Sequence, residues 1–273
     1  MPAPIVRVPR TLWRAGDTSK GERGIPEETA IAFTFNAASY AVMMATPKDL
    51  EDFAVGFAMT EGVVTSPNAI DTIEFVEEDT GIELRIWLKA RDAVEFLGRR
   101  RKMAGPTGCG LCGIESLTEA MQPPPKVGPG RAYTPDQIMS AVNSLFPLQT
   151  LNRETHAVHA AGFWQPERGI VAVREDVGRH NALDKLAGAL LREGNNAADG
   201  LVILTSRVSV EMVQKSAMIG APIIVAVSAP TALAVRMAEA AGMTVVAIAR
   251  KDGFEVFTNP QRVGLVPSPR LPS

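Results

Sequence analysis

This 273-residue sequence contains only two cysteines. It also lacks long apolar runs and a strong net charge. No apolar stretch reaches the ~18–20 residues of a membrane-spanning helix, and the first residues lack the apolar core of a secretory signal peptide. The formal net charge of −2 gives no reason to expect a nucleic-acid partner. With two cysteines and no export signal, we expect a protein of the reducing cytoplasm that does not bind membranes.

Common nucleotide-binding signatures are also absent. The sequence contains neither GxGxxG nor GxxxxGK[ST], so the usual dinucleotide and P-loop motifs do not apply. Apolar residues make up 46% of the chain, which is enough for a sizeable core in one large domain or two smaller ones.

Both cysteines, Cys109 and Cys112, lie in one glycine-rich run, GPTGCGLCG at residues 105–113. Such a run does not provide the apolar surroundings of a structural cysteine. Two thiols at this spacing can hold a metal, cycle as a dithiol or carry a sulfur atom. The dipole of a helix expected from Ile114 would lower the pKa of Cys112, whereas Cys109 lies further out in the run. A thioredoxin-like dithiol is disfavoured, because no strand leads into the motif and its usual aromatic residue and proline are missing.

The sequence predicts four regions: an N-terminal α+β subdomain (1–103), a mobile loop with the CxxC motif (104–130), an α/β domain (131–262) and a frayed tail (263–273). In the first region we expect strands at 29–36 and 40–45 and a hairpin of strands 72–77 and 82–88. A helix is expected to begin with Thr46 as N-cap and Pro47 in its first turn, and to end at Gly62.

The second half alternates between strands and helices. Strands are expected at 157–164, 170–174, 201–204, 223–227 and 243–249, with an edge strand at 254–258. Thr134 and Gln137 form a capping box that opens the first helix of this half. This order of elements predicts a largely parallel sheet covered by helices.

Polar residues follow the expected strands, at the sheet edge where α/β proteins bind ligands. Three of the four clusters run into a helix N-terminus, which favours an anion, and arginine suits phosphate. We therefore expect a pocket for a phosphate-bearing small molecule, although Ser209 and Thr231 could equally be plain N-caps. The candidate residues are Arg174, Arg179, His180, Ser206, Arg207, Ser209, Ser228, Thr231, Arg250, Lys251, Asp252 and Gly253.

A zinc site is a weaker alternative. His156 and His159 could join Cys109 and Cys112 as a Cys2His2 set. Their spacing is one residue shorter than usual, and residues three apart on a strand point to opposite faces. A core or pocket-lining position for these histidines is the preferred interpretation, with no metal held by the protein.

Six segments stand out in the sequence: DLEDFAVGF (49–57) with TEG (60–62), GCGLCG (108–113), THAVHAAG (155–162), REDVGRHNALDKL (174–186), SRVSVEMVQK (206–215) and SAPTALAV (228–235). They are spread over residues 30–258. In this combination and order they resemble the FdhD family of formate dehydrogenase accessory sulfurtransferases.

The resemblance implies a sulfur carrier that accepts persulfide sulfur from a cysteine desulfurase. The sulfur would pass to the molybdenum bis(molybdopterin guanine dinucleotide) cofactor, as a bound substrate, before the cofactor enters the formate dehydrogenase apoprotein. By the same match Cys109 is the persulfide carrier and Cys112 its partner. The cofactor-binding segment falls on Ile248, Ala249, Arg250, Lys251, Asp252 and Gly253.

The resemblance also implies a cytidine-deaminase-like three-layer α/β/α sandwich and a homodimer. Deaminase chemistry needs H-x-E and P-C-x-x-C motifs. Here the matching stretches are His159-Ala160-Ala161 and residues 206–209, which lack the glutamate and the zinc thiolates. We therefore expect a nucleotide-shaped pocket without deaminase activity. A chaperone that shelters the cofactor without moving sulfur is the remaining alternative.

Overall fold

The computed structural model describes residues 1–90, 93 and 123–265. The CxxC loop, the helix expected from Ile114 and most of the C-terminal tail lie outside the described residues. The division into domains stays a prediction, because the structure does not describe its central loop.

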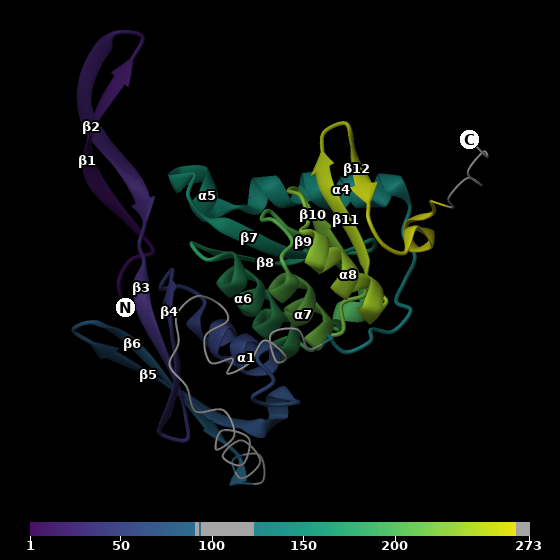
Figure 1. Ribbon diagram of the computed structural model, residues 1–273. Helices are drawn as coiled ribbons and strands as arrows, with labels where there is room; N and C mark the ends of the chain where they lie inside the picture. The colour runs from purple at the N-terminus through teal and green to yellow at the C-terminus, as the bar shows by residue number, and fades with distance from the viewer. Residues whose placement is uncertain (91–92, 94–122, 266–273) are drawn as a thin grey trace.

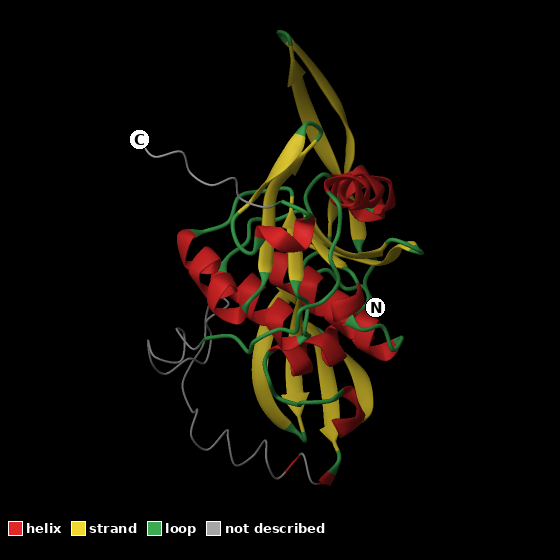
Figure 2. Ribbon diagram, turned by 90° about the vertical axis from the view of Figure 1, so that its right-hand side faces the viewer, coloured by secondary structure: helices red, strands yellow, loops and turns green. Residues whose placement is uncertain are grey.

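The chain begins with a long antiparallel hairpin, β1 (Ile5–Arg14) and β2 (Asp17–Pro26). It stands away from the rest of the molecule (Figures 1 and 2). Sequence analysis did not predict this hairpin. Almost all of its residues are exposed on both faces, so the apolar alternation that marks a half-buried strand is missing.

A four-stranded sheet follows, in the order β4-β3-β6-β5. Its strands are β3 (Thr29–Phe35), β4 (Ala38–Ala45), β5 (Ile70–Glu78) and β6 (Gly81–Leu88), so both expected hairpins are present. Helix α1 (Leu50–Thr60) covers one face. Phe33 stacks on Phe57 with ring centroids 4.0 Å apart and meets Phe53 edge-on, which fixes the helix on the sheet.

The expected start of this helix is wrong by three residues. Helix α1 begins at Leu50, after Asp49 in a left-handed conformation (φ 54°), and Thr46 is not its N-cap. The polar groups of Thr46 instead bind the second half of the chain, since its Oγ1 accepts from the amide of Val177 and its own amide donates to Asp176. A tertiary contact has replaced the local cap.

The second half is built on a six-stranded sheet in the order β12-β11-β10-β9-β7-β8. The prediction of a largely parallel sheet is wrong. Strands β9, β10 and β11 are parallel, whereas β7, β8 and β12 pair antiparallel. Strands β8 and β12 each follow their neighbour through a short turn, which reverses the chain. The strands are β7 (His159–Gln165), β8 (Gly169–Asp176), β9 (Leu201–Leu204), β10 (Ile223–Ala226), β11 (Thr244–Arg250) and β12 (Gly253–Val256).

Helices cover both faces of this sheet (Figure 1). Helix α4 (Pro135–Leu145) packs on one face and opens with the predicted capping box of Thr134 and Gln137. Helices α6 (Arg179–Arg192), α7 (Val210–Met218) and α8 (Ala232–Ala241) pack on the other. The deaminase-like arrangement stays a prediction. The remaining helical segments are α5 (Thr150–Thr155) and the 3-10 turns Pro67–Ala69, Phe146–Leu148, Ala197–Asp199 and Pro260–Val263.

The two halves meet where α1 crosses α6, and we call this contact the α1–α6 interface. Glycine allows the close approach: a Cβ on Gly56 would lie 1.7 Å from the carbonyl oxygen of Asp184, and one on Gly188 would lie 1.8 Å from that of Asp52. The two backbones are therefore in direct contact. No helix in the described part of the chain is long and apolar enough to cross a membrane.

Candidate functional site

The ends of four strands meet at one edge of the six-stranded sheet, which we call the strand-end edge. The start of β7 pairs with the end of β8 through His159 and Asp176. Thr205, after β9, donates its amide to Ala160, and the amide of Ile248 near the end of β11 donates to Ser228 after β10, at 3.2 Å. The antiparallel strands thus bring His159 to the same edge as the predicted clusters.

Three helices begin at this edge, as predicted. Their N-caps are Gly178 for α6, Ser209 for α7 and Thr231 for α8. Thr231 caps its helix, because its Oγ1 accepts from the amide of Ala234 at 3.2 Å. Ser209 makes no capping hydrogen bond; its hydroxyl instead acts on the carboxylate of Glu211.

Buried polar atoms without a hydrogen-bond partner gather between α6 and α7. They are Arg179 Nε, His180 Nε2, Ser209 Oγ and Glu211 Oε2, four of the six such atoms in the described part of the chain. Buried polar groups in native proteins nearly always have a partner, supplied by protein, water or ligand. These four atoms therefore mark the place where a polar ligand fits best.

The charges here are mixed. His180 Nε2 lies 3.8 Å from Glu211 Oε2, an ion-pair distance too long for a hydrogen bond. The neighbouring His180, helped by Ser209, lowers the pKa of Glu211 to about 2, so the carboxylate is ionised at neutral pH. Burial and the nearby positive charge of Arg179 lower the pKa of His159, which keeps this ring neutral. The edge thus offers a cation, a carboxylate and an uncharged imidazole.

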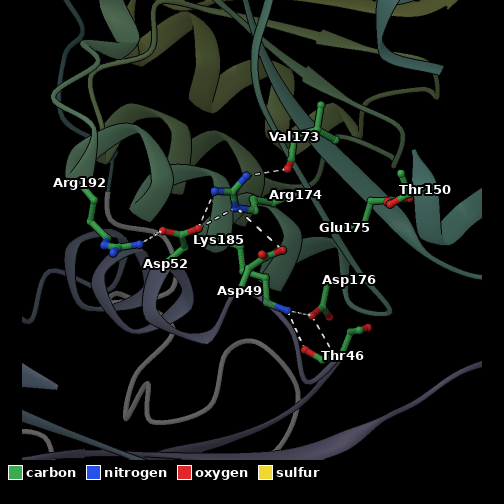
Figure 3. A network of polar contacts seen from close by, with 10 residues as sticks. All are labelled: Thr46, Asp49, Asp52, Thr150, Val173, Arg174, Glu175, Asp176, Lys185 and Arg192. Carbon is green, nitrogen blue, oxygen red and sulfur yellow. Dashed lines mark hydrogen bonds and ion pairs between the residues drawn. The ribbon is translucent and has the colours of Figure 1, made fainter. Parts of the chain in front are cut away.

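A buried network behind the edge fixes the start of α6 (Figure 3). Asp176 accepts hydrogen bonds from the amide of Gly178 at 2.7 Å, from Asn181 Nδ2 at 2.9 Å and from Lys185 Nζ at 2.6 Å. Lys185 is fully buried and also donates to the carbonyl of Thr46 at 2.8 Å. Burial lowers the pKa of Lys185, while Asp176 opposes that shift.

Arg174, a candidate ligand of phosphate, points elsewhere. Its guanidinium lies 2.7 Å from Asp52 and 3.9 Å from Asp49, both beside or within α1 (Figure 3). Asp52 also pairs with Arg192 of α6 at 2.6 Å. The charge of Arg174 is therefore used to join the two halves of the chain, and we remove this residue from the candidate set.

Two acidic residues of the site were missed by sequence analysis. Glu175 accepts from the amides of Leu151 and Asn152 at 2.8 and 2.9 Å, so a strand residue caps helix α5. Glu211 was not singled out, although it follows Ser209 by two residues in the first turn of α7. An acidic residue in a first helical turn is common, which is why its position alone gave no signal.

The remaining candidates lie along the rim. Ser206 is buried and donates to the carbonyl of Arg207, whose own side chain is exposed; Ser228 is half-buried. Of the predicted cofactor segment, Ile248, Ala249 and Arg250 belong to β11, Lys251 and Asp252 form an exposed turn, and Gly253 begins β12. Ile248 has a left-handed φ of 53°, rare for a β-branched residue, within a register irregularity of the strand pair.

The thiol candidates cannot be placed, because Cys109 and Cys112 lie outside the described residues. His156 is exposed in a left-handed conformation at the end of α5, and His159 faces the strand-end edge. Within the described ranges no cluster of His, Cys, Asp and Glu could hold a metal ion. The Cys2His2 alternative therefore stays untested.

A family comparison identifies the chain. The model of the FdhD/NarQ family matches residues 26–264. This chain belongs to the FdhD/NarQ family. The match includes both sheets and the whole strand-end edge, as the resemblance in the sequence motifs predicted.

Individual members of the family are similar to this chain over nearly its whole length. A protein named sulfur carrier protein FdhD from Agrobacterium fabrum is 51% identical, over 94% of this chain and 95% of its own. A protein of the same name from Brucella abortus is 49% identical, over 92% of this chain and 93% of its own. A crystal structure from Desulfotalea psychrophila, described as a candidate formate dehydrogenase accessory protein, has 25% identity. It superposes with a TM-score of 0.74 over 96% of this chain and all of that one.

Proposed function

We propose that this chain is a cytoplasmic sulfur carrier for formate dehydrogenase. It would accept sulfur from a cysteine desulfurase as a persulfide on Cys109 and pass it to the molybdenum bis(molybdopterin guanine dinucleotide) cofactor. The observation that carries the cofactor site is the set of four partnerless buried polar atoms at the strand-end edge. Membership in a family whose named members are sulfur carrier proteins supports the sulfur chemistry.

The strand-end edge fits the polar parts of such a cofactor. Arg179 and the free amides at the starts of α6, α7 and α8 would bind phosphate oxygens. The ionised Glu211 has His180 as its ion-pair neighbour, 3.8 Å away, and guanine offers ring and amino N–H groups that suit a carboxylate. Ser209 adds a hydroxyl between them.

Sulfur uptake requires no net oxidation. The Cys109 thiolate attacks the outer sulfur of the desulfurase persulfide; a new S–S bond forms on Cys109, and the desulfurase cysteine leaves as a thiolate. Release as sulfide needs two electrons. The thiolate of Cys112 supplies them by attacking the inner sulfur of Cys109, which forms a Cys109–Cys112 disulfide and expels HS⁻. A cellular dithiol then reduces that disulfide.

Intact-mass spectrometry tests the sulfur chemistry. After incubation with a cysteine desulfurase and cysteine, the wild type should gain one sulfur atom, about 32 Da, until Cys112 expels it as sulfide. Cys109→Ala should gain none, whereas Cys112→Ala should load sulfur but release no sulfide. Unmodified thiols in the wild type would contradict the proposal. If Cys109→Ala still activated formate dehydrogenase, the chain would be a cofactor chaperone without sulfur transfer.

The cofactor site has its own test, with GDP as the probe. Arg179→Gln removes a half-buried cation and should weaken GDP binding roughly tenfold or more, because hydrogen bonds to charged groups contribute ~1.5–3 kcal/mol. Arg236→Gln, on the exposed face of α8, makes the same charge change away from the edge and should bind GDP like the wild type. Equal affinities for all three proteins would contradict this placement of the site. Calorimetric titration measures them.

A further inference from the structure

Helix α7 differs from its two neighbours at the strand-end edge. It packs between α6 and α8 (Figure 1), and of these three helices it is the one with an acidic residue, Glu211, in its first turn. Because a helix N-terminus favours anions, the starts of α6 and α8 suit phosphate groups. At the start of α7 that place is taken by a carboxylate of the chain itself.

The carboxylate of Glu211 is held in its charged form. His180, the hydroxyl of Ser209 and the backbone amide of Glu211 itself lower its pKa to about 2. A carboxylate has two oxygens with about four lone-pair sites, and it can only accept hydrogen bonds. A ligand group that binds here must therefore bring N–H or O–H donors, whereas a phosphate would be repelled.

The starts of α7 and α8 are fixed side by side. Val208 and Pro230, each one residue before the N-cap of its helix, form a parallel β-bridge. The amide of Thr231 also donates to the carbonyl of Val208 at 2.9 Å. A ligand whose phosphates bind at Arg179 of α6 or at the start of α8 therefore meets the carboxylate of Glu211 in the helix between them.

Apolar surface for a flat ring lies at the same edge. Val210 and Leu233, in the first turns of α7 and α8, and Ile248 near the end of β11 pack against the core but are only half-buried. Binding sites for small molecules combine such apolar surface with a few placed polar groups. The edge thus has a part for phosphate, a part for a ring and a carboxylate for the donors of that ring.

Guanine is the nucleobase whose donors match a carboxylate. Its ring N1–H and its 2-amino group lie side by side, so each carboxylate oxygen can accept one charge-assisted hydrogen bond. Hypoxanthine lacks the amino group, and xanthine has a carbonyl oxygen in its place. Adenine and cytosine present an amino group beside a ring nitrogen that accepts. Each of these bases loses at least one hydrogen bond, or turns an acceptor toward the carboxylate.

We propose that Glu211 determines the base specificity of the cofactor site by accepting hydrogen bonds from N1–H and the 2-amino group of guanine. This inference rests on the proposed function, because it takes the nucleotide part of the cofactor to bind at the strand-end edge. It adds a selection step: a dinucleotide cofactor that carries another base, such as cytosine, is rejected before sulfur is transferred. Rejection follows because an acceptor that faces Glu211 leaves a charged group without its partner.

Calorimetric titration with GDP, inosine diphosphate and xanthosine diphosphate tests the assignment, because these nucleotides differ at position 2 of the ring. The wild type should bind GDP roughly tenfold or more tightly than the other two. In Glu211→Gln the amide oxygen can still accept from N1–H, but the amide NH2 now faces position 2 and suits the carbonyl of xanthine. This variant should reverse the order and bind xanthosine diphosphate roughly tenfold more tightly than GDP.

The control is Glu239→Gln, the same change at an exposed position of α8, which should keep the wild-type order. Thermal unfolding confirms that each variant is folded. A wild type with equal affinity for the three nucleotides, or a Glu211→Gln variant that still prefers GDP, would overturn the assignment and leave the Arg179→Gln test of the cofactor site unaffected. A wild type that binds none of them would overturn both. Sulfur loading of Cys109 is measured separately and does not depend on either result.

Discussion

At the scale of single residues, the strand-end edge is organised by a few charges whose effects can be measured one at a time. The chain has three histidines, of which His159 and His180 lie at this edge and His156 is exposed elsewhere. This small number makes each imidazole resonance assignable by substitution. The edge is therefore well suited to titration by NMR.

Arg179→Gln should raise the pKa of His159. Burial is the main cause of its lowered pKa and the positive charge of Arg179 the next, so removing that charge relieves part of the shift. Imidazole chemical shifts recorded against pH measure the change. His156 provides the internal reference, and an unchanged His159 titration would show that Arg179 does not act on this ring.

Glu211 should make the protein more sensitive to acid. Its folded pKa of about 2 is below the ordinary 4.5, so between these values the unfolded state binds more protons and stability rises with pH. The contribution is complete above pH 4.5 and is lost as pH falls toward 2. Urea unfolding across this window should show a shallower pH dependence for Glu211→Gln. Glu239→Gln, at an exposed position on α8, serves as the matched control.

At the scale of secondary-structure elements, the α1–α6 interface combines glycine contacts with buried charge. Lys215 of α7 donates to both carboxylate oxygens of Asp184 at 3.0 Å and to Thr60 at the end of α1 at 3.2 Å. Burial raises the pKa of Asp184. Burial alone would lower the pKa of Lys215, because it disfavours the charged form. The carboxylates of Asp184 and Glu61 outweigh this effect and hold the pKa above its ordinary value.

Gly56→Ala should destabilise the protein by about 3 kcal/mol or more, at the upper end of overpacking, because the new methyl group would meet backbone rather than a movable side chain. Gly21→Ala in β2 is the control. A Cβ there meets no atom within 4 Å, so the change should stay within about 0.5 kcal/mol. Urea unfolding of both variants measures the difference, and equal stabilities would show that α1 and α6 separate easily.

Elements with a local signal were predictable from the sequence. The hairpin of β5 and β6 follows from period-two alternation around its turn, and the Thr134–Gln137 capping box opens α4 as expected. Elements whose structure depends on contacts with distant parts of the chain could not be predicted from the sequence. Thr46 resembles an N-cap, but it binds Asp176, which lies 130 residues later in the chain.

The residues of the candidate site also fall into a predictable and an unpredictable group. The helix N-termini after β8, β9 and β10 were predictable because strand ends share an edge. The position of Arg174 was not predictable, because its partner Asp52 lies 122 residues earlier in the chain. Glu211 could be recognised only once burial showed that its oxygen lacks a donor.

At the scale of the whole molecule, each structural part carries one tryptophan. Trp13 lies on the β1–β2 hairpin, Trp87 in the four-stranded sheet and Trp164 in the six-stranded sheet. The α1–α6 interface couples the two sheets through buried ion pairs. Breaking such a pair usually costs 3–5 kcal/mol, so the two sheets should not unfold separately.

Single-tryptophan variants that retain Trp87 or Trp164 should therefore give the same urea midpoint by fluorescence. Asp176→Asn leaves Lys185 without its buried counterion and should lower both midpoints together. A Trp87 transition well before that of Trp164 would show that the sheets unfold independently.

The polar contacts between the two halves of the chain also determine where the polypeptide can be divided. A fragment of residues 131–262 would lack Asp52, Thr46 and Thr60, and so would leave Arg174, Lys185 and Lys215 each without one of its partners. Expressed alone, that fragment should be insoluble. Supplied together with residues 1–130, it should reassemble by complementation.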